Sequence, residues 1–333
     1  MQSPENTTSH QAGRALRHRF EGPFFRKLMI GGIRHIPQRV QRLTMPMWGS
    51  LFWALLPKAR HAATSNLDHV LGSASPLQRN LRTRQLFLNY SQMMADTYAV
   101  HLGRPLELDV TSLGRHHLLD AAAEGKGVIA ATGHIGMWQV GPFLAEWRSL
   151  PRFYMAMAEE PNPLVQQYEE RFRGRFNVIY TTSSPFSVLK LAQVLREGSI
   201  VGMQMDRHLG GHTHQLKFCG HDAWFPTGPA VLARSTGAPL VPSFFVVEPP
   251  QPGDKRRRIT HLLDAAITVP HTRDRAADIA EATEKLVAAY QRVVSRYPTQ
   301  WYQFYDFFLP PAAPAASESL AASRESQTAG SRS

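Results

Sequence analysis

The pattern of apolar and polar residues divides the chain into a helical first part and a second part of alternating strands and helices. Between residues 24 and 103 apolar residues recur every three or four positions, as on one face of an α-helix, and β-branched residues are few. From Gly127 onward, short apolar runs alternate with amphipathic stretches of helical length. The runs of strand length are residues 128–131, 153–157, 178–180, 200–205 and 240–247. Because strands that alternate with helices form parallel sheets, the expected fold is α/β, with a mainly parallel sheet flanked by helices and preceded by a helical region.

The last third of the chain adds three segments. Residues 257–264 have the pattern of an edge strand, and residues 275–296 are expected to form a long helix that stops before Pro298. The stretch 310–333 is rich in Pro, Ala and Ser and is expected to be disordered. The predicted organisation is therefore a mobile basic N-terminus, a helical region packed on the core, a single α/β core and a disordered tail. Their boundaries are 1–23, 24–103, 104–309 and 310–333.

Positive charge is concentrated in the first part of the chain. The protein has 37 Lys and Arg against 26 Asp and Glu, a net charge of +11. Residues 1–60 contain ten Lys or Arg and two Glu, interleaved with Phe, Trp and Leu. This combination is typical of a surface that lies on anionic lipid head groups. One alternative is a basic helical pair that packs on the core; another is nucleic-acid binding, which we do not expect because no nucleic-acid module is recognisable.

The apolar run 45–56 bears on how the chain meets a membrane. It is shorter than the roughly 20 residues that span a bilayer. It also follows a long polar stretch and precedes no cleavage site, so it is a poor signal peptide. We therefore expect peripheral or monotopic attachment. Cys219 is the only cysteine, which excludes disulfides within the chain and fits a reducing compartment.

The strongest candidate site is the sequence Gly-Val-Ile-Ala-Ala-Thr-Gly-His-Ile-Gly-Met-Trp-Gln-Val-Gly-Pro at 127–142. An apolar strand ends at Thr132, His134 follows, and a helix is expected to begin near Gly136. Catalytic groups in α/β sheets gather at the carboxyl ends of strands, and histidine titrates near neutral pH. His134 is therefore a candidate general base. Gly136 would let a substrate approach the imidazole closely.

A second buried strand ends in Asp206 and Arg207. These two side chains could reach the same crevice, where one could orient an acceptor and the other could hold a phosphate or a developing oxyanion. An ion pair that only fixes the following loop is the alternative.

Two further features follow Arg207 in the sequence. The turn Thr227–Gly228 before Pro229 is expected to open a helix, whose free backbone N–H groups could bind a phosphate or an oxyanion. Four histidines of a Gly-rich loop invite a metal interpretation, but neither a pair of cysteines nor a pair of carboxylates accompanies them, and no metal or other cofactor is expected. They are His208, His212, His214 and His221.

Taken together, these segments resemble the bacterial lysophospholipid acyltransferase superfamily, in its branch of late lipid A biosynthesis acyltransferases. The resemblance covers about residues 66–308. It rests on the order of several short motifs, among them the Thr-Gly-His-Ile-Gly-Met-Trp-Gln stretch and the aromatic ending Gln-Trp-Tyr-Gln-Phe-Tyr. Their positions are 132–139, 161–163 with Arg171, 204–207, 218–220, 225–229, 232–242 and 300–305.

The resemblance implies a mechanism. A histidine takes the proton of an acceptor hydroxyl, which attacks an acyl thioester, and an Asp or Glu five positions later orients the imidazole. His134 matches the histidine, but Gln139 stands at the acid position. Gln139 can fix the tautomer yet cannot stabilise an imidazolium, at a cost of roughly 1.5–3 kcal/mol, or tenfold to a hundredfold in rate.

Three outcomes stay open at this point. Gln139 orients His134 in a weaker pair, a carboxylate elsewhere replaces the acid, or the chain is a catalytically degenerate homologue that only binds lipid. We favour an active enzyme. The carboxylates considered are Asp206, Glu146, Glu159 and Glu160, and the residues expected to contact substrate are Gly136, Trp138, Arg171, Arg207, Thr227 and Gly228.

The resemblance also implies the partners and the location. The donor would be acyl carrier protein or acyl-coenzyme A, each of which carries negative charge that suits a basic protein. The acceptor would be a lipid A precursor, a lysophospholipid or another glycolipid. The expected location is the cytoplasmic face of the cell inner membrane.

Overall fold

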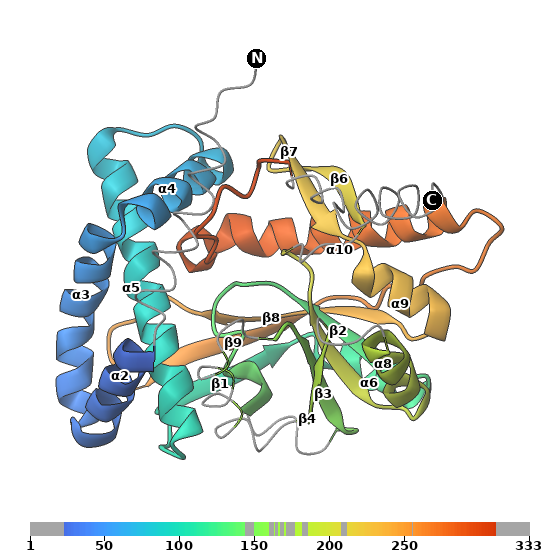
Figure 1. The fold of residues 1–333 in the computed structure, drawn as a ribbon, viewed down its shortest axis with the longest axis horizontal. Coiled ribbons are helices and arrows are strands. Elements are labelled where there is room, and N and C mark those ends of the chain that lie inside the picture. Colours follow the sequence, from blue (N-terminus) through green and yellow to red (C-terminus); the bar gives the residue numbers. More distant parts are fainter. Residues whose placement is uncertain are drawn as a thin grey trace, which may run out of the picture.

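The computed structural model describes residues 23–143, 150–159, 163, 166, 170, 177–181, 186–207, 212–254 and 256–310. Its first part is helical, as the sequence predicts, and forms a stack at one end of the molecule (Figure 1). The helices are α2 (Pro23–His35), α3 (Gln38–Leu55), α4 (Pro57–Leu71) and α5 (Pro76–His101). The start of α5 is set by a capping box, because the Ser75 hydroxyl accepts from the Gln78 N–H and the Gln78 side chain accepts from the Ser75 N–H.

Close packing joins α3 to α5. Gly49 of α3 is buried, and a Cβ placed on it would lie 2.9 Å from the Leu88 Cα atom of α5. Only glycine therefore allows the two backbones to approach this closely. None of the helices among the described residues is both long and apolar enough to cross a membrane.

The second part contains a sheet of seven strands in the order β1-β9-β8-β2-β5-β3-β4. The five strands from β8 to β4 run parallel, and β9 turns antiparallel to β8, so the predicted α/β fold class is confirmed. The strands are β1 (Leu108–Leu113), β2 (Val128–Thr132), β3 (Phe153–Met157), β4 (Asn177–Tyr180), β5 (Ile200–Gln204), β8 (Leu240–Val247) and β9 (Arg257–Leu263).

Three expectations about single elements were wrong. β9 is not an edge strand, because β1, which the sequence pattern did not reveal, pairs along its outer side. The segment thought to be a Gly-rich loop contains an antiparallel hairpin of β6 (Thr213–Phe218) and β7 (His221–Pro226). After Gly136 the described chain forms turns and the short 3-10 helix η1 (Gly141–Phe143) in place of a regular helix.

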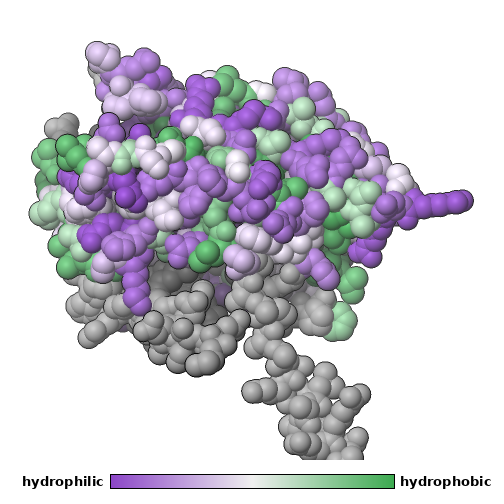
Figure 2. Space-filling view, turned by 90° about the horizontal axis from the view of Figure 1, so that it is seen from above, coloured by the Kyte–Doolittle hydropathy of each residue, from purple (hydrophilic) through white to green (hydrophobic). Residues whose placement is uncertain are grey.

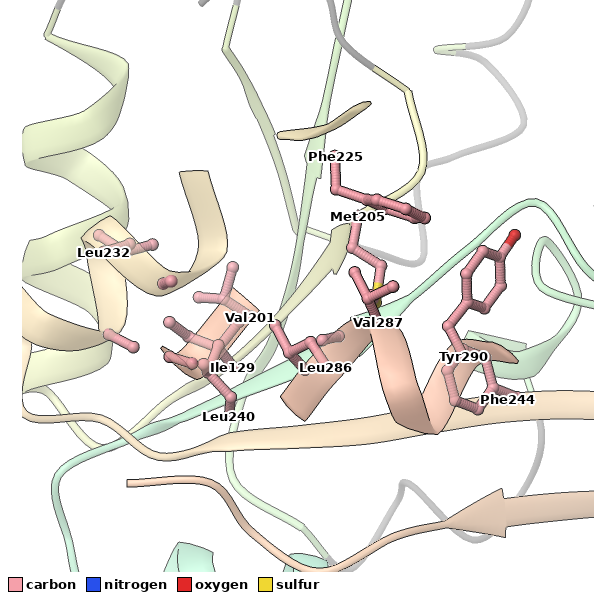
Figure 3. Packing of buried hydrophobic residues seen from close by; sticks show 14 of the residues in the cluster. Ile129, Val201, Met205, Phe225, Leu232, Leu240, Phe244, Leu286, Val287 and Tyr290 are labelled. Atoms are coloured by element: carbon pink, nitrogen blue, oxygen red, sulfur yellow. The ribbon is translucent and has the colours of Figure 1, made fainter. Parts of the chain in front are cut away.

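Helices cover both faces of the sheet. The largest apolar cluster lies between the sheet and α8 (Ser187–Arg196), α9 (Gly228–Thr236) and α10 (Arg275–Arg296), and Figure 3 shows part of it. On the opposite face α6 (Arg115–Ala123) packs through Leu118 and Ala121. After α10 the chain passes through η3 (Pro298–Gln300) into an irregular closing segment, residues 301–307. Residues 1–22 and 311–333, where a mobile start and a disordered tail were predicted, lie outside the described residues.

Candidate active site

The register of two neighbouring strands brings His134 and Asp206 together. β2 and β5 pair in parallel, with Thr132 opposite Gln204, so the residues two positions beyond each strand meet at the same edge of the sheet. The His134 Nδ1 atom lies 2.7 Å from Asp206 Oδ1, and the His134 main-chain N–H donates to Oδ2 at 2.6 Å. Both residues are buried.

Four donors surround the Asp206 carboxylate. Besides the two from His134, the Tyr290 hydroxyl of α10 and the Gln303 amide of the closing segment each donate to Oδ2 at 2.6 Å. Figure 3 shows the Tyr290 oxygen pointing away from the apolar cluster that holds its ring. A carboxylate has about four acceptor sites, so these donors compensate for the loss of water around a buried charge.

The electrostatics keep this carboxylate ionised. Burial alone would raise the pKa of Asp206, but the charges of His134 and Arg207 and the hydrogen bonds from His134 and Tyr290 outweigh it, so the pKa lies below its usual value. Burial, with the nearby Asp206 charge, raises the pKa of Tyr290 well above the usual value, so its hydroxyl keeps its proton and donates. Because an ionised carboxylate only accepts, His134 Nδ1 must carry a hydrogen, and Nε2 is then the basic nitrogen.

The closing segment and η3 before it fix the main chain around His134. The Tyr302 N–H donates to the His134 carbonyl at 2.8 Å, and the Gly136 N–H donates to the Gln300 carbonyl at 2.9 Å. The N-terminal helices hold this segment in turn. The Asn66 amide of α4 donates to the carbonyls of Gln303 and Tyr305.

The carboxylate on Nδ1 belongs to Asp206, one of the alternatives that the sequence left open. Among the described residues no hydrogen bond joins Gln139 to the His134 ring, and Gln139 is partly exposed. Glu159 is exposed, and Glu146 and Glu160 lie outside the described residues. The geometry thus favours Asp206 over Gln139 as the group that orients the imidazole.

The glycines beside His134 allow other parts of the protein to pack closely against the main chain. A Cβ on Gly133 would lie 2.6 Å from the Tyr290 hydroxyl oxygen, and one on Gly136, whose φ is +59°, would lie 1.9 Å from the Phe245 carbonyl oxygen. Substrate contact by Gly136 stays a prediction. Trp138 packs edge-on against the His134 ring, with centroids 4.8 Å apart, and its buried indole N–H has no partner among the described residues.

A largely apolar cavity lies on the α6 side of the sheet and reaches Trp138. Thr132, Gln204 and Ser243 are the polar side chains that line it. Its apolar lining comes from β2, β3, β5 and β8 together with the indole, namely Ala130, Trp138, Phe153, Met155, Ala156, Met157, Met203 and Phe245. The cavity therefore borders the indole that packs against the His134 ring.

Of the remaining predicted residues, Arg207 lies beside the pair, and the others lie apart from it or outside the described residues. Arg207 donates to the Tyr302 carbonyl at 3.1 Å and to the Gln303 side chain at 3.3 Å, so it braces the closing segment next to Asp206. Thr227 donates through its hydroxyl to the His212 carbonyl, and no hydrogen bond within the described part links Thr227 or Gly228 to His134 or Asp206. Arg171 lies outside the described residues.

The histidine cluster is only partly described. His208 lies outside the described residues, and His214 lies 3.8 Å from Glu284. Within the described part of the chain, no three His, Cys, Asp or Glu side chains are grouped as a metal site would need.

Two residues of the site were not predicted. Tyr290 lies on the buried face of α10 among apolar neighbours. The helical periodicity of the sequence predicts a core position there, but no feature of the sequence indicates that the hydroxyl donates to a carboxylate. Gln303 falls within the aromatic ending that supported the family resemblance. That ending was a signal for its importance but not for its contact with Asp206.

Comparison with known proteins places the chain in a family. Residues 15–309 match the family described as bacterial lipid A biosynthesis acyltransferase, and the protein belongs to this family. The family that the sequence resemblance pointed to is thereby confirmed.

Two of the similar curated proteins are named as acyltransferases of a glycolipid, phosphatidylinositol mannoside. The chain is 26% identical over 200 residues to a phosphatidylinositol mannoside acyltransferase of Mycobacterium tuberculosis, covering 59% of each protein. It is 27% identical over 201 residues to the protein of the same name from Mycolicibacterium smegmatis, covering 59% of this chain and 60% of the relative. The chain thus matches less than two thirds of the length of these relatives. Among solved structures, the 1-acyl-sn-glycerophosphate acyltransferase PlsC of Thermotoga maritima matches with a TM-score of 0.36 and 11% identity, over 78% of this chain and 98% of that one.

The hydrogen bond from Tyr290 to Asp206 gives a prediction on stability. Tyr290→Phe removes one donor from a buried charge and should lower the free energy of unfolding by about 1.5–3 kcal/mol at neutral pH. The carboxylate's contribution is complete above the pKa of an unfolded Asp, about 3.9, and is lost as pH falls through the lower pKa of the folded protein. The loss caused by Tyr290→Phe should therefore shrink below about pH 4, as urea unfolding at a series of pH values would measure. A loss that stays constant over that range would contradict the role of Tyr290.

Proposed function

We propose that the protein transfers a fatty acyl group from a thioester to a hydroxyl group of a glycolipid, with His134 as the general base and Asp206 as the residue that orients it. The single observation that carries this proposal is the 2.7 Å contact between His134 Nδ1 and the buried Asp206 carboxylate. It leaves Nε2 as the nitrogen that can accept a proton from an alcohol. Membership of the acyltransferase family supplies the reaction class.

The proposed step balances without any cofactor. His134 Nε2 takes the proton as the acceptor oxygen forms a bond to the thioester carbon, and the negative charge collects on the former carbonyl oxygen. The C–S bond then breaks, and the imidazolium returns its proton to the leaving thiolate. Asp206 lowers the free energy of the imidazolium, because its negative charge lies in hydrogen-bond contact with Nδ1.

The lipid-binding but inactive homologue is the rival function. It would follow if His134 had lost its acidic partner, as Gln139 suggests when the sequence is considered alone. The buried Asp206 favours the enzyme, since an ionised carboxylate held buried against a histidine, with a shifted pKa, is typical of functional sites.

The charge of the protein and the names of its relatives support the proposed donor and acceptor. An acyl carrier protein or coenzyme A carries negative charge and suits a chain of net charge +11. The relatives named for phosphatidylinositol mannoside support a glycolipid acceptor. A lipid A precursor, which the family description suggests, is also a glycolipid. Both substrates are consistent with a protein attached peripherally to the cytoplasmic face of the inner membrane.

We further propose that the apolar cavity beside Trp138 holds the acyl chain. What supports this is that Trp138 contacts the His134 ring and also lines the cavity, so the space lies one side chain away from the imidazole that the thioester would approach. Each buried methylene is worth about 0.8 kcal/mol, a factor of roughly four in binding. Chain length should therefore affect transfer strongly.

The assay that tests the catalytic roles measures thioester consumption with acyl carrier protein and coenzyme A donors over a panel of lipid acceptors. His134→Ala and Asp206→Asn should each lower kcat about a hundredfold or more, because each removes part of the proton-transfer system. Gln139→Leu should change kcat less than about tenfold, since Gln139 makes no hydrogen bond to the ring in the described structure.

The contrast between Asp206→Asn and Gln139→Leu decides the assignment. A large loss with Gln139→Leu and a small one with Asp206→Asn would transfer the orienting role to Gln139. A wild-type protein that consumes no thioester on any pair, yet binds the same lipids, would be the inactive homologue. Circular dichroism on each variant separates loss of chemistry from loss of fold.

The cavity is tested by a bulky substitution and a matched control on the other face of the sheet. Met155→Trp should lower kcat/KM for a palmitoyl donor at least about tenfold more than for a hexanoyl donor, because the larger tryptophan side chain occupies space that the longer acyl chain needs. Val188→Trp, at an exposed position of α8, should affect both donors equally little. Equal losses for the two donors with Met155→Trp would show that the acyl chain binds elsewhere.

A further inference from the structure

The outer side of α3 carries a continuous row of exposed apolar side chains. They are spaced three or four residues apart, with Trp48 beside them, so they share one side of the helix. Their exposed fractions run from 40% to 82%, whereas the inner side of α3 packs on α5 through Gly49. We call this row the α3 apolar face. It consists of Val40, Leu43, Met47, Trp48, Leu51 and Leu55.

This face is at one extreme of the molecule. In Figure 1 α3 is the outermost helix on the left, with α5 between it and the sheet. In Figure 2, turned about the horizontal axis, hydrophobic residues lie along the same left edge; smaller hydrophobic groups appear at the right edge, and hydrophilic residues predominate between them. A water-soluble protein seldom leaves such a contiguous apolar area uncovered.

The charge around the α3 apolar face has one sign. Residues 22–67 contain seven Lys or Arg and no Asp or Glu. Arg34 just before α3 and Lys58 just after it are both exposed, so cations flank the row at its two ends. The helix itself is about 27 Å long at 1.5 Å per residue.

We propose that the α3 apolar face lies in the boundary between the head groups and the acyl chains of an anionic lipid bilayer, with α3 parallel to the membrane plane. An amphipathic helix with apolar side chains in the middle and cations at the rim is the pattern of interfacial attachment. Anionic head groups neutralise Arg34 and Lys58 while the apolar side chains leave water. The inference rests on the proposed function only in that the acceptor is a lipid.

A second copy of the chain fits this face less well. In a two-fold symmetric pair the same face meets itself, so antiparallel α3 helices would place Arg34 of one copy beside Lys58 of the other. No acidic residue within 22–67 could offset that repulsion. A surface that binds an acidic protein would carry cations at its centre, whereas the centre of the α3 apolar face is apolar.

The test compares binding of two double variants to vesicles of phosphatidylglycerol and phosphatidylcholine, with vesicles of phosphatidylcholine alone as the reference. Leu43→Gln with Met47→Gln removes apolar area from the α3 apolar face without changing charge. Val188→Gln with Leu189→Gln does the same at positions of comparable exposure on α8, at the other end of the molecule. The α3 variant should lower the partition coefficient about tenfold, and the α8 variant should bind as the wild type does.

Quenching reports on depth directly. Lipids brominated in the acyl chain should quench part of the tryptophan fluorescence of the bound wild type, and Trp48→Phe should remove most of that quenching. Equal vesicle binding by the wild type and the α3 variant would overturn the inference. So would a lipid-free dimer in sedimentation velocity that the α3 variant abolishes.

Transfer rates on detergent-dispersed acceptor separate this inference from the proposed function. An α3 variant that keeps the wild-type rate in detergent but loses vesicle binding supports the inference and reports an intact fold. A wild type that binds vesicles through α3 but transfers no acyl group leaves the inference standing and rejects the proposed function.

Discussion

The buried carboxylate of Asp206 is the constraint on which the rest of the site depends. Placing a charge there is unfavourable unless donors replace the lost water. The four donors come from three distant parts of the chain, because His134 follows β2, Tyr290 belongs to α10 and Gln303 lies in the closing segment. Satisfying one side chain therefore fixes the relative positions of the strand ends, the long helix and the C-terminal residues.

The same network connects the chemistry to the helical first part. Asn66 of α4 holds the closing segment through two carbonyls, and that segment holds both the His134 carbonyl and the Asp206 carboxylate. The N-terminal helices are thus part of the support of the site as well as the carrier of the α3 apolar face. If that face lies on a membrane, the support of His134 is attached to the surface from which a lipid acceptor would come.

Much of the fold and the positions of His134 and Asp206 could be predicted from the sequence, because the patterns that indicate them are local. The strand ends that place His134 and Asp206 follow from short apolar runs, and parallel strands bring such ends together. β1 was missed although its half-buried and exposed residues alternate, because the strand is short and none of its positions is fully buried. β9 was then taken for an edge because the strand that pairs along its outer side had been missed. The hairpin at 213–226 was missed, since its histidines were assigned to a Gly-rich loop and Gly and His conceal the alternation of its strands.

The orienting residue could not be settled by sequence spacing. The family pattern points to the position of Gln139, which is close to His134 in sequence, whereas the acid that contacts the ring comes from 72 residues further along the chain. Tyr290 and Gln303 were beyond reach for the same physical reason, since their hydrogen bonds depend on tertiary packing.

The most direct test of the assignment is the proton NMR signal of the His134 Nδ1–H group. A hydrogen shared with a buried carboxylate should give a resonance shifted far downfield and protected from exchange with water. The account predicts that this signal is present in the wild type and in Gln139→Leu and absent in Asp206→Asn. A signal that survives in Asp206→Asn but disappears in Gln139→Leu would contradict the central claim that Asp206 orients the base.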